Sequence, residues 1–177
     1  MPTSVTGTSN VMRAGGSSGT ARPARSRRSP KPRLALHLQV VSRAAPVPAS
    51  AQIRRWARAA LKGSAEITVR VVGAAEARTL NRRYRGRDYA ANVLSFPYVL
   101  RHGLVQGDIV LCAPVIAREA LTQGKTVEAH LAHLTVHALL HLQGYDHLRR
   151  RDAARMEALE KKLLAKLGYP DPYYAPG

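Results

Sequence analysis

Acidic residues are scarce in this chain. Only 11 Asp and Glu stand against 28 Lys and Arg among 177 residues, which gives a formal net charge of +17. An excess of this size indicates a polyanionic partner, and nucleic acid is the first candidate. A solvated, charged surface is the alternative that charge alone leaves open.

Cysteine and long apolar runs are also lacking. Cys112 is the only cysteine, so no disulfide can form within the chain, and a lone thiol is typical of a reducing compartment. It ends the apolar run 109–112, and we expect it to pack as a small hydrophobe. No apolar stretch reaches the 18 residues that would span a membrane. We therefore expect no membrane partner and a cytoplasmic protein.

Residues 1–33 contain no acidic residue and few bulky apolar ones. They hold seven of the 28 basic residues, so the remaining 21 against 11 acidic residues still give +10. Because this segment can bury little apolar surface, we predict a disordered basic tail. A solvated tail, a basic arm for RNA and an organelle transit peptide all fit this composition. Organelle import therefore stays open.

From residue 34 onward, strand and helix patterns alternate. Period-two alternation and short apolar runs predict strands at 34–40, 66–72, 93–96 and 108–112. Helical periodicity and end signals predict helices at 50–61, 74–84, 114–123, 126–143 and 152–167. We therefore expect a single α/β (α+β) domain over residues 34–174. It should have a four-stranded mixed sheet, about five helices, and a metal site on a helix and the turn after it.

His137 and His141 lie four residues apart in the predicted helix 126–143, so their side chains share one helix face. Two imidazoles placed in this way can chelate one metal ion, and a third ligand must come from another direction. Gly144 is placed to end the helix and turn the chain back, which brings His147 toward the ion. The pattern predicts one Zn²⁺ per chain, held by His137, His141 and His147.

Two further histidines precede these ligands. His133 continues the row but sits roughly 12 Å along the axis from His141, at about 1.5 Å per residue. Three ligands in a straight row would flank an ion without surrounding it. We expect His130 and His133 to support the ligands from behind or to lie at the surface.

The spacing His-x-x-x-His-x-x-Gly-x-x-His matches that of the metzincin metalloproteases. A protease of that type needs a Glu directly after the first His as its general base, and Ala138 stands there. Peptide hydrolysis is therefore disfavoured. Three imidazoles with an open fourth position can still lower the pKa of a bound water to near 7.

A second group of candidate residues is basic. Arg82, Arg83, Arg85 and Arg87 surround the end of the predicted helix 74–84 and the loop after it. Guanidinium groups can bind phosphate bidentately and offset the charge that develops on it during cleavage. We predict that Arg82, Arg83 and Arg87 bind nucleic acid. A solvated basic loop is the alternative.

Taken together, these motifs resemble the YbeY family of bacterial and organellar endoribonucleases. Residues 137–147 resemble its metal signature, His-Gly-x-Leu-His-Leu-x-Gly-Tyr-Asp-His. Four other segments agree in order: 80–88, 92–97, 107–109 and 167–173. The resemblance covers about residues 34–174. Ala138 replaces the usual Gly, and Ala90-Ala91 replace the usual Pro-Thr.

The resemblance implies zinc on the three histidines and Arg85 as the catalytic arginine. It implies a single-strand-specific, metal-dependent endoribonuclease that acts in ribosomal RNA processing, including maturation of the small-subunit 3′ end, and in ribosome quality control. It also implies contact with ribosomal RNA and with a small-subunit ribosomal protein or an Era-type GTPase.

A non-catalytic, zinc-containing ribosome assembly factor is the main alternative, and a metalloprotease is a weaker one. Structural zinc sites are usually closed by four protein ligands. Only three strong ligands are found here, which favours an open, reactive site.

Overall fold

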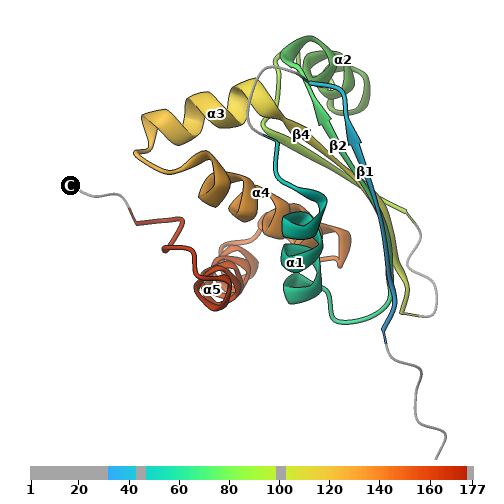
Figure 1. Cartoon of the computed structure of the whole chain (residues 1–177), viewed down its shortest axis with the longest axis vertical. Helices are drawn as coiled ribbons and strands as arrows, with labels where there is room; N and C mark the ends of the chain where they lie inside the picture. The colour runs from blue at the N-terminus through green and yellow to red at the C-terminus, as the bar shows by residue number, and fades with distance from the viewer. Residues whose placement is uncertain (1–31, 43–46, 99–102, 175–177) are drawn as a thin grey trace, which may run out of the picture. The chain divides into compact units, whose positions relative to one another are not determined.

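The computed structural model describes residues 32–42, 47–98 and 103–174, so the predicted tail lies outside it except for residues 32 and 33. Figure 1 shows the arrangement of the chain. The described residues form four strands and five helices, as the sequence predicts: β1 (Leu34–Val40), α1 (Ser50–Ala60), β2 (Ala65–Val72), α2 (Ala74–Arg85), β3 (Val93–Pro97), β4 (Val105–Cys112), α3 (Ala113–Thr122), α4 (Val127–Leu142) and α5 (Arg150–Leu167).

The four strands form one mixed sheet in the order β1-β2-β4-β3. β1, β2 and β4 are parallel, and β3 runs antiparallel to β4. Period-two alternation directs Ile67 and Val69 of β2 into the core and leaves Glu66 and Thr68 on the other face. The predicted mixed sheet is confirmed.

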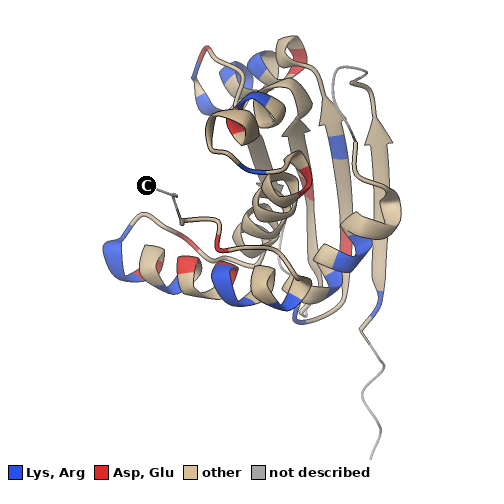
Figure 2. Cartoon of the chain, turned by 60° about the vertical axis from the view of Figure 1, so that its left-hand side comes forward, with Lys and Arg blue, Asp and Glu red and all other residues tan. Residues whose placement is uncertain are grey.

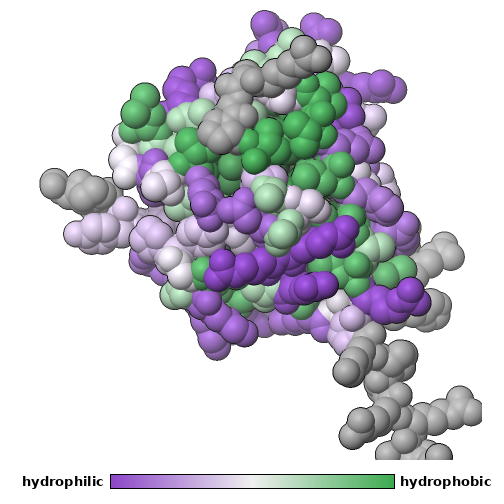
Figure 3. Space-filling model, viewed as in Figure 1, coloured by the Kyte–Doolittle hydropathy of each residue, from purple (hydrophilic) through white to green (hydrophobic). Residues whose placement is uncertain are grey.

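Helices α1, α4 and α5 pack together on one face of the sheet, and α2 lies on the other (Figure 1). Trp56, Ile109 and Leu139 are fully buried in the core between the sheet and the helices. Each large apolar side chain buried in this way contributes roughly 1.5–3 kcal/mol. In Figure 3 the part of the surface over α1 and α5 is mainly hydrophilic, which fits the amphipathic pattern of both helices.

Helix α4 is fixed at both ends. At its start, the Ala129 N–H donates to Thr126 Oγ1 at 3.1 Å. At its end, Leu142 packs against Gly107 of β4. A Cβ at Gly107 would lie 2.6 Å from the carbonyl oxygen of Phe96 and 2.7 Å from a Leu142 methyl carbon. Only glycine therefore lets the end of α4 approach the β3–β4 pair this closely.

The observed elements begin and end within about two residues of the predicted ranges, except at the start of β4. Strand β4 begins at Val105, three residues before the predicted start, because polar Gln106 and a glycine interrupt the apolar run without interrupting the pairing with β2. The sequence suggests Ser50 as the cap of this helix, but Ser50 is the first residue of α1 and Ala49 is the cap. The Ala49 N–H at the cap position is satisfied by Oε1 of Gln52 at 2.9 Å.

Candidate active site

Three histidines meet at the C-terminal end of α4. His137 and His141 project from successive turns of the helix, and His147 lies in the segment that follows. Each offers one ring nitrogen, and these three atoms lie within 4.8 Å of one another. The Nε2 atoms of His137 and His141 are 3.1 Å apart. This set of donors could hold one metal ion, and imidazole ligands suit zinc, copper, iron or nickel.

The turn after α4 returns the chain to the helix end. Gly144 has a φ of 84°, a left-handed conformation that L side chains rarely adopt, and its N–H donates to the His141 carbonyl at 2.9 Å. Oδ1 of Asp146 then accepts from the N–H of Leu148 at 3.1 Å, which orders the backbone around His147. The helix stop expected at Gly144 is confirmed.

A buried carboxylate supports His137 from behind. Glu160 of α5 is 0% exposed, and its Oε1 lies 2.7 Å from Nδ1 of His137. Its Oε2 lies 3.2 Å from Nε2 of His133 and accepts from the hydroxyl of Tyr173. Burial alone would raise the pKa of Glu160, but these three hydrogen bonds hold it at about 2. With Nδ1 of His137 donating to this carboxylate, Nε2 is left to face the cluster.

The environment of His141 keeps its ring neutral. Burial and, after it, the charges of His137 and His147 lower the pKa of His141, while a hydrogen bond with the backbone of Tyr145 opposes the shift. A neutral imidazole is the form that binds a metal ion. The site is therefore disposed toward a cation at neutral pH.

His130 and His133 lie behind the cluster. His130 is buried, and its Nε2 lies 2.9 Å from Oε2 of Glu119. His133 contacts Glu160, as described above. The alternative of a surface position is wrong for His130, since it is 3% exposed and contacts Glu119 of α3.

Arg85 lines the same cavity as the histidines. It is the last residue of α2, and Gly86 ends the helix with a φ of 68°. The Nη2 group of Arg85 donates to the carbonyl of Ser95 in β3 at 3.2 Å. Arg85 and the three histidines line one cavity of about 400 Å³, whose wall includes residues of β3 and of the turn after α4.

The loop after α2 is held in place by two sets of hydrogen bonds. Asn81 is buried and donates from Nδ2 to the Tyr89 carbonyl at 2.9 Å. Arg78 forms two hydrogen bonds with Asp88, at 2.6 and 2.8 Å. The Ala90-Ala91 pair, where the resembled family usually has Pro-Thr, therefore sits in a loop anchored from α2.

The structure separates the arginines that the sequence groups together. The Arg83 guanidinium lies 5.5 Å from the centre of the Tyr84 ring, and that ring packs edge-on against Phe96 at 5.1 Å. Arg82 and Arg83 are absent from the wall of the histidine cavity, whereas Arg87 lines a neighbouring one. Figure 2 shows the basic end of α2 close to α3, while α4 carries no Lys or Arg.

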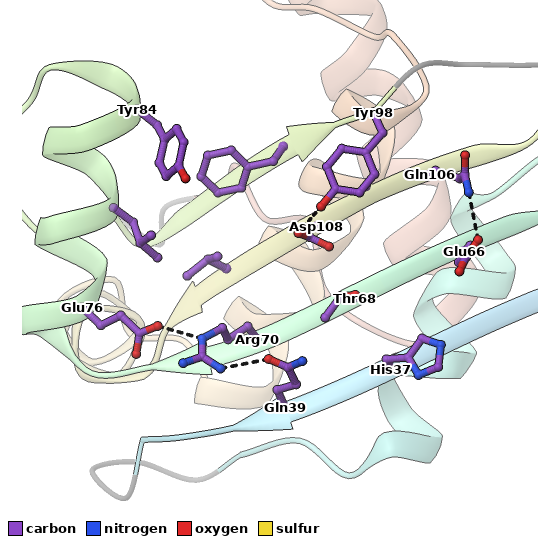
Figure 4. Close-up of a pocket in the computed structure, with 14 residues that line it drawn as sticks. His37, Gln39, Glu66, Thr68, Arg70, Glu76, Tyr84, Tyr98, Gln106 and Asp108 are labelled. Carbon is purple, nitrogen blue, oxygen red and sulfur yellow. Dashed lines mark hydrogen bonds and ion pairs between the residues drawn. The ribbon is translucent and has the colours of Figure 1, made fainter.

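A larger cavity, of about 560 Å³, lies on the outer face of the sheet. Figure 4 shows its wall, in which Gln106 donates to Glu66 and the Tyr98 hydroxyl donates to Asp108. Arg70 of β2 pairs with Glu76 of α2. It shares no residue with the histidine cavity. It is therefore a separate surface and not part of the candidate active site.

Comparison with known proteins identifies the family. Residues 43–168 match the family described as Endoribonuclease YbeY. The chain belongs to the endoribonuclease YbeY family. The expectation of an RNA-cleaving hydrolase is thereby confirmed at the level of the family.

Individual relatives agree with this assignment. An endoribonuclease YbeY from Aromatoleum aromaticum is 63% identical over 126 residues, which cover 71% of this chain and 81% of the relative. One from Methylobacillus flagellatus is 54% identical, covering 80% of this chain and 95% of the relative. The solution structure of a Thermotoga maritima protein aligns with a TM-score of 0.50 at 21% identity, covering 77% of this chain and 99% of that one, and supports the fold alone.

Sequence reasoning missed Glu160. In the sequence, apolar residues of α5 repeat at helical spacing at Met156, Leu159, Leu163 and Leu167. The buried residues of α5 are instead Met156, Glu160, Leu164 and Leu167. A carboxylate at a helix position that faces the core costs folding free energy unless it is paired with hydrogen-bond donors or an opposite charge. Its place within that apolar stripe is the signal that could have found it.

Among the described residues, no helix is long and apolar enough to cross a membrane.

Proposed function

We propose that the chain is a single-strand-specific endoribonuclease that cleaves ribosomal RNA, with one Zn²⁺ held by His137, His141 and His147. The observation that carries the proposal is the single cavity into which these three imidazoles and Arg85 project. When bound, the ion would lower the pKa of a coordinated water to near 7 and so supply hydroxide at neutral pH.

Arg85 has the role of holding the scissile phosphate. Its hydrogen bond to the Ser95 carbonyl orients the guanidinium while leaving further N–H groups for a ligand. A preorganised cation at this place offsets the negative charge that grows on the phosphoryl oxygens during cleavage. Ala138 lines the same cavity and cannot accept a proton, so the neighbouring helix position supplies no general base.

Residues 1–33 are proposed to act as a basic arm for RNA, and residues 34–174 as the catalytic domain. An open site is favoured over a purely structural zinc site because three imidazoles leave one tetrahedral position unfilled. The lack of a base at Ala138 speaks against a metalloprotease.

The proposal is tested by incubating zinc-loaded and chelator-treated protein with ribosomal RNA and with casein. Zinc-dependent cleavage of RNA, with casein intact, is the expected result. Zinc binding without RNA cleavage would instead support the assembly factor, and digestion of casein would support the protease.

We further propose maturation of the small-subunit RNA 3′ end, and ribosome quality control, as the cellular role, carried out in the cytoplasm. A small-subunit ribosomal protein or an Era-type GTPase is the proposed partner. The wall of the outer sheet cavity holds the carboxylates Glu66, Glu76 and Asp108 and one arginine, a charge balance that suits a basic protein segment. Co-sedimentation with purified small subunits, compared between the natural chain and a Glu66→Gln/Asp108→Asn variant, tests this surface.

A further inference from the structure

A second cavity adjoins the histidine cavity. It has a volume of about 530 Å³ and shares Arg85, Asn92, Val93 and Leu94 with its neighbour. The shared residues lie where the loop after α2 enters β3. The two hollows therefore lie next to each other, with Arg85 in the wall of both.

The second cavity is lined by arginines that have no acidic partner among the described residues. Arg87 and Arg118 line it together with Arg85. Both are exposed, and neither side chain forms an ion pair or hydrogen bond with any residue that the structure describes. In contrast, Arg78 is occupied by Asp88 in two hydrogen bonds. Free guanidinium groups that face a polar hollow are suited to bind phosphate.

The one carboxylate in this wall is already engaged. Oε2 of Glu119 accepts from Nδ2 of Asn92 at 3.0 Å and lies 2.9 Å from Nε2 of His130. Three arginines therefore face one carboxylate that is bonded to its own protein. The local balance favours an anion in the hollow.

The remaining wall offers space and an aromatic ring. Ala90 and Ala91 have small side chains, and Tyr89 beside them is 52% exposed. The hydrogen bond from Asn81 to the Tyr89 carbonyl fixes the backbone from which this ring projects. Basic grooves with exposed aromatic rings are typical of sites that follow a single strand of nucleic acid.

We propose that this second cavity binds the phosphodiester next to the one that is cleaved, with Arg87 and Arg118 on its oxygens and Tyr89 against a base. Arg118 of α3 becomes a substrate-binding residue that the sequence did not single out. The inference rests on the proposed ribonuclease function. It predicts that the RNA strand runs from the histidine cavity past Arg85 to α3.

The first test measures binding and needs no cleavage. Fluorescence anisotropy is recorded for metal-free protein with a single-stranded oligoribonucleotide in which one phosphate at a time is replaced by a neutral methylphosphonate. At one position the replacement should weaken binding to the natural chain roughly tenfold but have a clearly smaller effect on the Arg118→Ala variant, in which only Arg87 remains on that phosphate. Equal losses in both proteins at every position would overturn the subsite.

The second test uses cleavage of substrates of increasing length. Extending the RNA across the subsite should raise kcat/KM of the zinc-loaded natural chain. Arg118→Ala should lower kcat/KM for the long substrate more than for the short one, so that this gain is largely lost. Arg58→Ala, an exposed arginine on α1, is the matched control for loss of one charge. Equal loss on short and long substrates would contradict the subsite. If no RNA is cleaved at all, the ribonuclease function fails, and the binding test still decides the subsite.

Discussion

Oε1 of Glu160 lies 2.7 Å from Nδ1 of His137, and this contact joins α5 to the helix that carries the histidine cluster. The same carboxylate also receives hydrogen bonds from His133 and Tyr173. A carboxylate behind a metal-binding histidine fixes the tautomer and the orientation of its ring. Glu160 is therefore a positioning residue, placed to keep Nε2 of His137 toward the cavity.

Glu160→Gln should weaken zinc binding about 10–100-fold, which is the usual cost of removing such a partner. An amide is uncharged and presents one acceptor oxygen, so it cannot serve three donors equally. Competition with a chromophoric chelator measures the affinity. Glu157→Gln, one turn earlier on the exposed side of α5, is the matched control. Unchanged affinity in a folded Glu160→Gln protein would remove Glu160 from this role.

Replacing any one of His137, His141 and His147 by alanine should remove most of the zinc, because two imidazoles bind far more weakly than three. His133→Ala should retain the metal, since its ring faces Glu160 and not the cluster. Elemental analysis of the purified variants gives the zinc content per chain. Full zinc in His147→Ala would refute the assignment of the third ligand.

The site residues that the sequence predicts lie close together along the chain, whereas those that it does not predict are far from the residues they support. His137 and His141 are joined by a helix turn and His147 by a short glycine turn, so local geometry is enough to bring them together. Glu160 is 23 residues from His137 and Arg118 is 33 residues from Arg85, and no periodicity connects either pair. Their positions depend on how α5 and α3 pack, which a single sequence leaves undetermined.

Gly107→Ala should destabilise the fold by about 1–3 kcal/mol, the usual cost of forcing an extra methyl group into a packed site. The new Cβ would collide with the Phe96 carbonyl and with Leu142 at the end of α4. Urea unfolding measures the change. Gly73→Ala is the control, since nothing lies within 4 Å of a Cβ at that position. Equal stability of the two variants would mean that the end of α4 can move away.

Deleting residues 1–33 should reduce the salt dependence of RNA binding without abolishing cleavage. The segment carries seven basic residues and no acidic one. Each phosphate contact that is lost lowers the slope of log affinity against log salt by about 0.7 for single strands. The slope is obtained from RNA affinities measured at salt concentrations from about 50 to about 200 mM. An unchanged slope would mean that the segment makes no contact with RNA.

Arg85→Ala should leave the fold and the zinc content intact but slow RNA cleavage by about a hundredfold or more, equivalent to roughly 3 kcal/mol. Arg85 is exposed at the end of α2, and its side chain's one hydrogen bond to a described residue is to the Ser95 carbonyl, so its removal disturbs little packing. Its charge, however, lies in the same cavity as the histidines, where no other arginine lines the wall. Arg85→Lys should recover little of the rate, because an ammonium group cannot bind a phosphate bidentately. The measurement is single-turnover cleavage of a ribosomal RNA fragment, with zinc content determined on the same samples. A zinc-loaded Arg85→Ala protein that cleaves at the natural rate would exclude Arg85 from the reaction and direct attention to Arg87, which lines the adjoining cavity.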